Sequence, residues 1–125
     1  MKRVQLAAVA ALAAFVLPAA SALGAQSALA APPKLIGTVG PGFTISLTQG
    51  GKKVKALKAG TYTFVITDKS GNHSYGLDGP NGWSKDFTSV AFVGTKSFTV
   101  TLKKGKYKYY CQPHESFMFG NFTVS

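Results

Sequence analysis

Residues 61–67 read Thr-Tyr-Thr-Phe-Val-Ile-Thr, an alternation of threonines with large apolar side chains. Successive side chains of a strand point to opposite sides, so Tyr62, Phe64 and Ile66 share one face and the threonines share the other with Val65. A period-two pattern of β-branched and aromatic residues is typical of a half-buried β-strand. This segment therefore predicts an all-β protein.

The same alternation recurs along the chain between turn sequences. Further strands are predicted at residues 43–47, 97–102, 106–110 and 122–124. Gly-rich or Pro-rich turns separate them, at residues 40–42, 50–51, 69–72, 78–82 and 103–105. Short strands divided in this way indicate an antiparallel Greek-key β-sandwich or barrel. Residues 80–95 carry no clear pattern, and a loop or a short helix is expected there.

The amino-terminal residues have the composition of an export signal. Lys2 and Arg3 precede an uncharged apolar run over residues 6–17, and residues 18–31 are rich in small side chains. This order of a positive, an apolar and a small-residue region is that of a secretory signal peptide.

We expect a signal peptide over residues 1–30, cleaved after about residue 22 or residue 30, and a single domain over residues 31–125. The domain would be exported to the periplasm, the cell surface or the medium. An uncleaved membrane tether is the competing interpretation, because residues 6–25 approach the length that spans a bilayer.

Most of the candidate chemistry lies in residues 109–120, which read Tyr-Tyr-Cys-Gln-Pro-His-Glu-Ser-Phe-Met-Phe-Gly. This segment holds the only cysteine, Cys111, together with His114 and Met118, and the other histidine, His73, lies upstream. A cysteine without a partner in an exported domain is a dimer bridge, a reactive thiol or a metal ligand. Thiolate, imidazole and thioether donors together select copper, and a His-His-Cys set with a weak axial Met is a blue-copper electron-transfer site.

Each of these residues, taken alone, also suits a structural role. Cys111 fits a buried thiol, His73 a turn, His114 a solvated loop and Met118 the core. The joint placement of all four soft donors favours the metal site.

On the pattern Tyr-x-Cys-x-Pro-His...Met-x-Gly, with one histidine well upstream, the sequence resembles the small cupredoxins, the plastocyanin, pseudoazurin and amicyanin group. The resemblance extends over roughly residues 35–125. It implies one copper ion, with His73, Cys111 and His114 as equatorial ligands and Met118 as the axial ligand.

The resemblance also implies that His114, in the loop between cysteine and methionine, is the exposed ligand through which electrons pass. Candidates for an apolar docking patch around it are Pro113, Phe117 and Phe119. Ser74 stands where many members have Asn. The resemblance therefore does not extend to the side-chain contact by which that Asn usually connects the two sides of the site, here called the brace. The backbone N–H of Ser74 is still expected within reach of the Cys111 sulfur.

These observations predict a monomeric, mononuclear type 1 copper protein that carries single electrons between redox partners, such as a cytochrome or an oxidoreductase. The alternative is extracytoplasmic copper storage, delivery or sensing by the same site, which exposed ligands and rapid copper exchange would indicate. An enzyme is not predicted, because neither an acid or amide partner for a Cys-His nucleophile nor a substrate pocket is apparent.

The chain is basic, with fourteen Lys and Arg side chains against four Asp and Glu and a net charge of +10. Loss of Lys2 and Arg3 with the signal would leave twelve lysines against four acids, or +8. Such a balance suits solubilising lysines at strand edges, or steering toward an acidic redox partner or an anionic membrane surface. Residues 106–110 alternate lysine with tyrosine, so a single-stranded nucleic-acid-binding β-barrel is a remote alternative. The export signal and the absence of arginine from residues 31–125 count against nucleic-acid binding.

Overall fold

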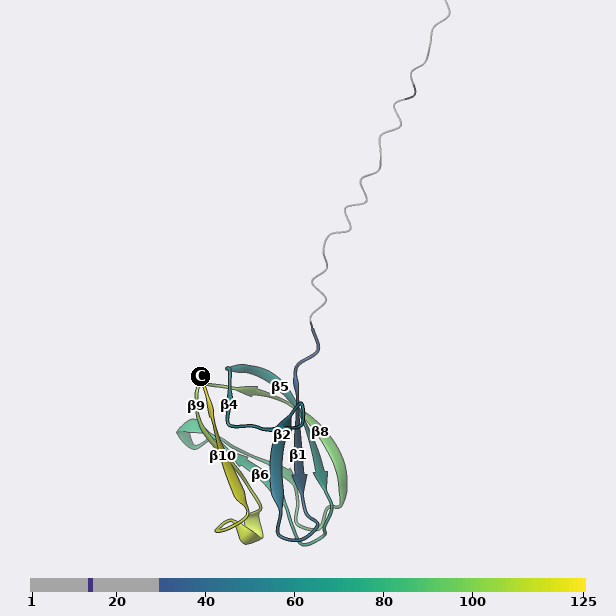
Figure 1. Ribbon diagram of the computed structural model, residues 1–125, viewed down its shortest axis with the longest axis vertical. Helices are drawn as coiled ribbons and strands as arrows, with labels where there is room; N and C mark the ends of the chain where they lie inside the picture. The colour runs from purple at the N-terminus through teal and green to yellow at the C-terminus, as the bar shows by residue number, and fades with distance from the viewer. Residues whose placement is uncertain (1–13, 15–29) are drawn as a thin grey trace, which may run out of the picture. The chain divides into compact units, whose positions relative to one another are not determined.

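The computed structural model describes Ala14 and residues 30–125. The expected signal peptide lies outside the described residues, apart from Ala14 and Ala30. Residues 31–125 form one compact unit, which Figure 1 shows as two layers of β-strands. Within the described part of the chain, no helix is long and apolar enough to cross a membrane.

The first layer is a five-stranded sheet. Its strands are β1 (Lys34–Val39), β2 (Ile45–Gln49), β3 (Lys52–Lys53), β5 (Gly60–Asp68) and β8 (Gly94–Leu102). They lie in the order β3-β2-β1-β5-β8. In β5 the predicted faces are confirmed, because Tyr62, Phe64 and Ile66 are buried whereas the side chains between them are not.

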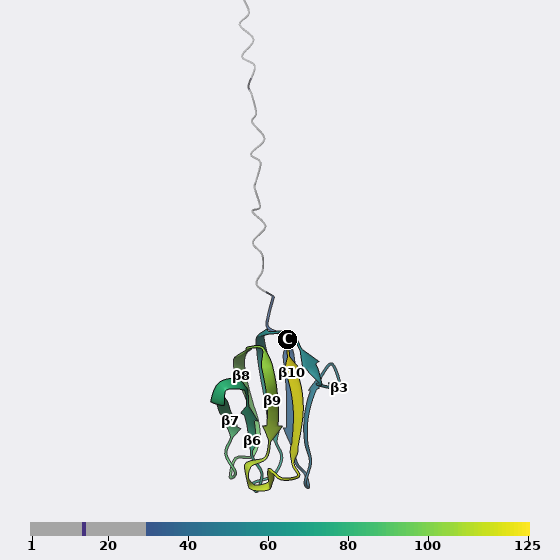
Figure 2. The same cartoon turned by 90° about the vertical axis from the view of Figure 1, so that its left-hand side faces the viewer.

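The second layer is also five-stranded. Its strands are β4 (Ala56–Leu57), β6 (Tyr75–Asp78), β7 (Ser84–Thr88), β9 (Gly105–Tyr110) and β10 (Phe119–Val124). Their order is β4-β10-β9-β6-β7, and Figure 2 looks onto this sheet. Two short 3-10 turns complete the elements, η1 (Pro80–Gly82) and η2 (Gln112–His114). Residues 80–95, which lacked a clear pattern, thus hold η1, the edge strand β7, a turn and the start of β8.

The predicted all-β sandwich is confirmed, but its pairing is not purely antiparallel. Each sheet contains one parallel pair, β1 with β5 and β4 with β10. Alternation along one strand fixes which face is buried and says nothing about the direction of its neighbour. The expected strand at residues 43–47 begins at Ile45, which leaves Phe43 in the loop that precedes it.

Aromatic side chains fill much of the space between the sheets. Phe64 stacks on Phe87 with ring centroids 5.1 Å apart, and Tyr107 stacks on Phe122 at 5.1 Å. Such pairs contribute about 0.5–1.5 kcal/mol each beyond the area that they bury. The first pair joins the two sheets, and the second joins neighbouring strands of the second sheet.

The two ends of the sandwich differ in what they carry. The nine residues of β5 run from one end to the other, roughly 25 Å at the usual rise per strand residue. At the lower end in Figure 1 lies η2, and at the upper end β1 begins and β10 finishes. We call these the η2 end and the opposite end.

Candidate metal centre

Two neighbouring strands bring the candidate ligands to the η2 end. Cys111 directly follows β9, and His73 lies two residues before β6. Because β6 and β9 pair antiparallel, with Gly76 opposite Tyr110, the start of one strand lies beside the finish of the other. His114 joins them through η2, where its N–H donates to the Cys111 carbonyl at 3.1 Å.

The donor atoms of these three residues converge on one point. The Cys111 sulfur lies 3.6 Å from Nδ1 of His73 and 3.6 Å from Nδ1 of His114, and the two nitrogens are 3.2 Å apart. The point equidistant from the three atoms is about 2.0 Å from each, close to the bond lengths of imidazole and thiolate ligands to a first-row metal ion. The three residues would therefore be able to bind one metal ion together.

The three ligand candidates differ in exposure. Cys111 and His73 are 0% and 1% exposed, whereas His114 is partly exposed. Thiolate and imidazole donors, buried away from competing water, suit a soft metal such as copper better than a hard, oxygen-seeking ion. Only the His114 side of the cluster reaches the surface.

Main-chain hydrogen bonds hold Met118 close to Cys111 and His114. The Cys111 N–H donates to the Met118 carbonyl at 3.0 Å, and the Met118 N–H donates to the His114 carbonyl at 2.8 Å. The Met118 side chain is 1% exposed. The structure thus places residue 118 beside Cys111 and His114, buried at the same end of the sandwich.

Ser74 connects the two segments that supply the donors. Its N–H donates to the Cys111 sulfur at 3.5 Å, which confirms the expected reach of that group. Its hydroxyl accepts the Gln112 N–H at 3.0 Å. Although Ser74 stands where many cupredoxins have Asn, a side-chain brace across the site is therefore present.

Phe43 is a residue of this site that the sequence did not reveal. It is 64% exposed, and its ring packs edge-on against His114 at 5.1 Å and against His73 at 5.8 Å. The alternation at residues 43–47 had placed it in a strand, but the preceding Gly-Pro-Gly turn carries it over the histidines. The Gly-Pro-Gly turn is a signal that residue 43 lies in a loop, but nothing in the sequence places that loop beside the histidines.

Phe43 also completes an apolar surface around the exposed histidine. Phe117 is 58% exposed, with its ring 5.5 Å from both Phe43 and His114. We call these three residues the histidine patch. Phe119, another candidate, is 45% exposed, but its ring lies under the Lys108 ammonium at 4.8 Å.

A buried hydrogen-bond network supports the His73 segment. The Tyr75 N–H donates to the Thr88 hydroxyl at 2.9 Å, which donates to the Asp68 carboxylate at 2.9 Å. The same carboxylate accepts the Ser70 N–H at 3.2 Å, and the Ser70 carbonyl accepts the His73 N–H at 3.3 Å. Burial raises the pKa of Asp68 above its usual value, although these hydrogen bonds oppose the shift.

Comparisons with known structures agree with this architecture. The copper protein rusticyanin is 20% identical, with a TM-score of 0.55 over 74% of this chain and 76% of that one. Reduced rusticyanin gives 21% identity and a TM-score of 0.54, over 74% and 78% of the two chains. A reduced amicyanin mutant gives 18% and 0.50, over 79% and 89%. At such identities the likeness extends to the fold alone.

Comparison with curated protein sequences gives no significant match. A family model does match, described as copper binding proteins of the plastocyanin/azurin family, over residues 44–125. The match covers more than half of the chain and includes His73, Cys111, His114 and Met118. The cofactor that both this family and the donor cluster fit is a single type 1 copper ion. The chain belongs to the plastocyanin/azurin family of copper-binding proteins.

Proposed function

We propose that this chain is an exported, monomeric electron carrier in which His73, Cys111 and His114 hold copper in a plane and Met118 is the axial ligand. The observation that carries the proposal is the convergence of one sulfur and two nitrogens on a single point. Copper held by such donors cycles between Cu(II) and Cu(I) and so takes up and releases one electron.

The chain holds its donors in place through several independent contacts. The Ser74 N–H fixes the Cys111 sulfur, and the Asp68 network fixes the segment that carries His73. A site whose ligands are held by the surrounding fold rearranges little when the metal changes charge, which favours rapid electron transfer.

Burial also favours a carrier over copper storage, delivery or sensing. Cys111 and His73 are enclosed by the protein, so a competing ligand cannot reach them without displacing the loops around them. A protein that hands its copper on needs the opposite, ligands that a recipient can approach. The same site would therefore exchange electrons far more readily than it exchanges metal.

Electrons would pass through the histidine patch, where the one ligand candidate that reaches the surface is surrounded by Phe43 and Phe117. This surface suits a redox partner that docks by apolar contact. Eight of the twelve lysines of residues 31–125 lie at the opposite end of the sandwich, so docking at the patch does not require an acidic partner.

The decisive experiment is to load the purified protein with Cu(II) and to record its visible absorption and electron paramagnetic resonance. We expect an intense thiolate-to-copper band and a narrow copper hyperfine splitting. Both should disappear in Cys111→Ser and persist in Ser116→Ala, a control at an exposed position of the same loop. A colourless wild-type protein, or colour that survives Cys111→Ser, would refute the site.

A second measurement separates the carrier from a copper store. Stopped-flow reduction of the Cu(II) protein should be fast and reversible. Transfer of copper to a chelator should be much slower than this reduction. Copper transfer that outpaces reduction would favour storage or delivery instead.

A further inference from the structure

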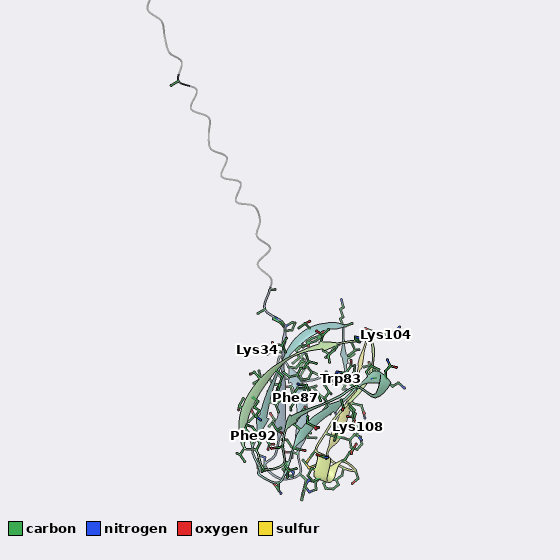
Figure 3. The ribbon with its side chains drawn as sticks, turned by 180° about the vertical axis from the view of Figure 1, so that it is seen from behind. Lys34, Trp83, Phe87, Phe92, Lys104 and Lys108 are labelled. Carbon is green, nitrogen blue, oxygen red and sulfur yellow. The ribbon has the colours of Figure 1, made fainter. Side chains whose placement is uncertain are left out.

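The lysines are distributed unevenly over the domain. Eight of the twelve in residues 31–125 lie at the end of the sandwich opposite η2, and all eight are exposed: Lys34, Lys52, Lys53, Lys55, Lys58, Lys103, Lys104 and Lys106. We call this set the basic end. Figure 3 labels two of its members, Lys34 and Lys104, at the upper end of the domain.

The strand pairing places the eight lysines together. Lys52 and Lys53 pair with the finish of β2, which lies beside the start of β1. Lys34 begins β1, and Lys103 and Lys104 form the turn between β8 and β9. Thr123, near the finish of β10, pairs with Lys106 and donates its N–H to the Lys55 carbonyl at 3.1 Å. Lys58 lies two residues before β5, where its carbonyl accepts the Tyr62 hydroxyl at 2.7 Å.

No acidic side chain shares this end. The four acids of the chain are Asp68, Asp78, Asp86 and Glu115. Asp68 finishes β5 at the η2 end, Glu115 follows η2, and Asp78 and Asp86 lie on β6 and β7. Among the described residues the only ion pair joins Lys108 to Glu115, so the positive charge of the basic end is not neutralised within the domain.

The surface between these lysines is grooved and partly aromatic. One groove of about 210 Å³ is lined by Lys55 and Lys106 with the polar side chains of Asn121 and Thr123. A second, of about 270 Å³, is lined by Lys103 and Trp83 among others. Trp83 is 37% exposed, and its ring packs on Tyr107 at 6.1 Å. A surface that combines lysines with an exposed tryptophan is typical of one that rests on the headgroup layer of a membrane.

The position of the basic end argues against a redox partner as its occupant. It lies at the far end of β5 from the copper ligands, roughly 25 Å away. A partner bound there would be too far from the metal for rapid electron transfer. β1 also begins at this end, at Lys34.

We propose that the basic end, with Trp83, is a docking surface for a membrane rich in anionic phospholipid. The lysines supply the attraction to the headgroup phosphates, the two grooves accept headgroups between Lys55 and Lys106 and beside Lys103, and Trp83 enters the interface. Docking in this orientation turns the histidine patch away from the lipid, so that copper stays accessible to a partner.

Trp83 provides the measurement, because it is the only tryptophan of the chain. The full chain, loaded with copper and reduced, is titrated with vesicles of phosphatidylglycerol and with vesicles of phosphatidylcholine. With phosphatidylglycerol we expect the Trp83 emission to shift to the blue and the protein to float with the vesicles. Binding should vanish between about 0.01 M and about 1 M salt, as the screening length falls from about 30 Å to about 3 Å.

Two matched triple variants test which face binds. Lys55→Gln/Lys104→Gln/Lys106→Gln removes three charges from the basic end, and a control, Lys69→Gln/Lys85→Gln/Lys96→Gln, removes three elsewhere. A lysine near an anionic surface contributes about fivefold to binding, so the first variant should bind on the order of a hundredfold more weakly. The control should lose far less, and both should keep the copper absorption band as a check of folding.

The orientation is tested with the bound protein. Reduction of the Cu(II) form by a small soluble reductant should be as fast on vesicles as in solution. Equal losses in the two triple variants would refute a defined face, and slower reduction on vesicles would refute the orientation.

Binding of inorganic phosphate that depends on the same lysines, without any binding to phosphatidylglycerol vesicles, would assign the grooves to a soluble anion instead. Vesicle binding does not need copper, so its failure and the failure of the electron-carrier proposal are distinguishable.

Discussion

Ser74 and Cys111 are joined by a hydrogen bond, from the Ser74 N–H to the cysteine sulfur at 3.5 Å, although they lie in different segments of the chain. The Ser74 hydroxyl adds a second link by accepting the N–H of Gln112 at 3.0 Å. Both sides of the metal cluster are therefore tied together by one residue.

Ser74→Ala removes only the hydroxyl link. We expect the free energy of unfolding to fall by about 1 kcal/mol, because the Gln112 N–H loses its partner in a partly buried position. The copper absorption band should change little, since the N–H that reaches the Cys111 sulfur stays. Urea unfolding of the two proteins, with Ser116→Ala as the exposed control, measures the effect. Equal losses in both serine variants would contradict a brace at Ser74.

Phe43→Ala should open the copper site to solvent. Its ring covers edges of both His73 and His114, and an aromatic contact of about 1 kcal/mol corresponds to roughly fivefold in a rate. We expect copper to pass to a chelator about fivefold faster than in the wild type. Phe119→Ala removes the same ring from a site beside Lys108 and should leave the chelator rate unchanged. A Phe43→Ala rate equal to that of the wild type would show that the ring does not shield the metal.

Met118→Leu tests the proposed axial ligand. The loop should keep its shape, because its closure depends on the Met118 main chain, and a swap of similar volume usually costs less than about 1.5 kcal/mol of stability. An axial thioether favours Cu(II), so its loss should raise the reduction potential measured by voltammetry. An unchanged potential and an unchanged paramagnetic spectrum would remove Met118 from the ligand set.

Asp68→Asn should change how stability depends on pH. Burial raises the pKa of Asp68 in the folded state above 3.8, so the folded protein holds the proton more firmly than the unfolded chain does. Its contribution to stability is complete below pH 3.8 and is lost as the pH rises through the folded-state pKa. The difference in unfolding free energy, wild type minus Asp68→Asn, should therefore fall as the pH rises from 3.8 through the folded-state pKa of Asp68. Urea unfolding at a series of pH values measures it, and a flat difference would contradict the shift.

The fold class followed from the sequence because alternation is a local property. Tyr62, Phe64 and Ile66 are buried as the pattern of β5 predicts, since a strand exposes its side chains to its two faces whatever its neighbours are. The parallel pairing of β1 with β5 could not be predicted in this way. It depends on how distant segments cross between the sheets, which alternation does not encode.

The candidate site was predictable to the extent that its donors are rare residues in one pattern. Cys111, His114 and Met118 are close in sequence, and their grouping needed no tertiary information. Phe43 and the Asp68 network were out of reach, because phenylalanine and aspartate are common residues whose roles here arise only when loops from different strands meet. For the same reason the sequence did not predict the hydrogen bond from the Gln112 N–H to the Ser74 hydroxyl, which stands where many family members have the amide of Asn.

The main-chain hydrogen bonds between Cys111 and Met118 have a consequence for the variability of this loop. Cys111, His114 and Met118 close it through their own N–H and carbonyl groups, whereas the side chains of residues 115–117 face solvent. Substitutions at those three positions can therefore alter the surface offered to a partner without disturbing the bonds that set the positions of the metal donors. Substitutions in this loop can therefore change the specificity for a partner without changing the chemistry of the copper.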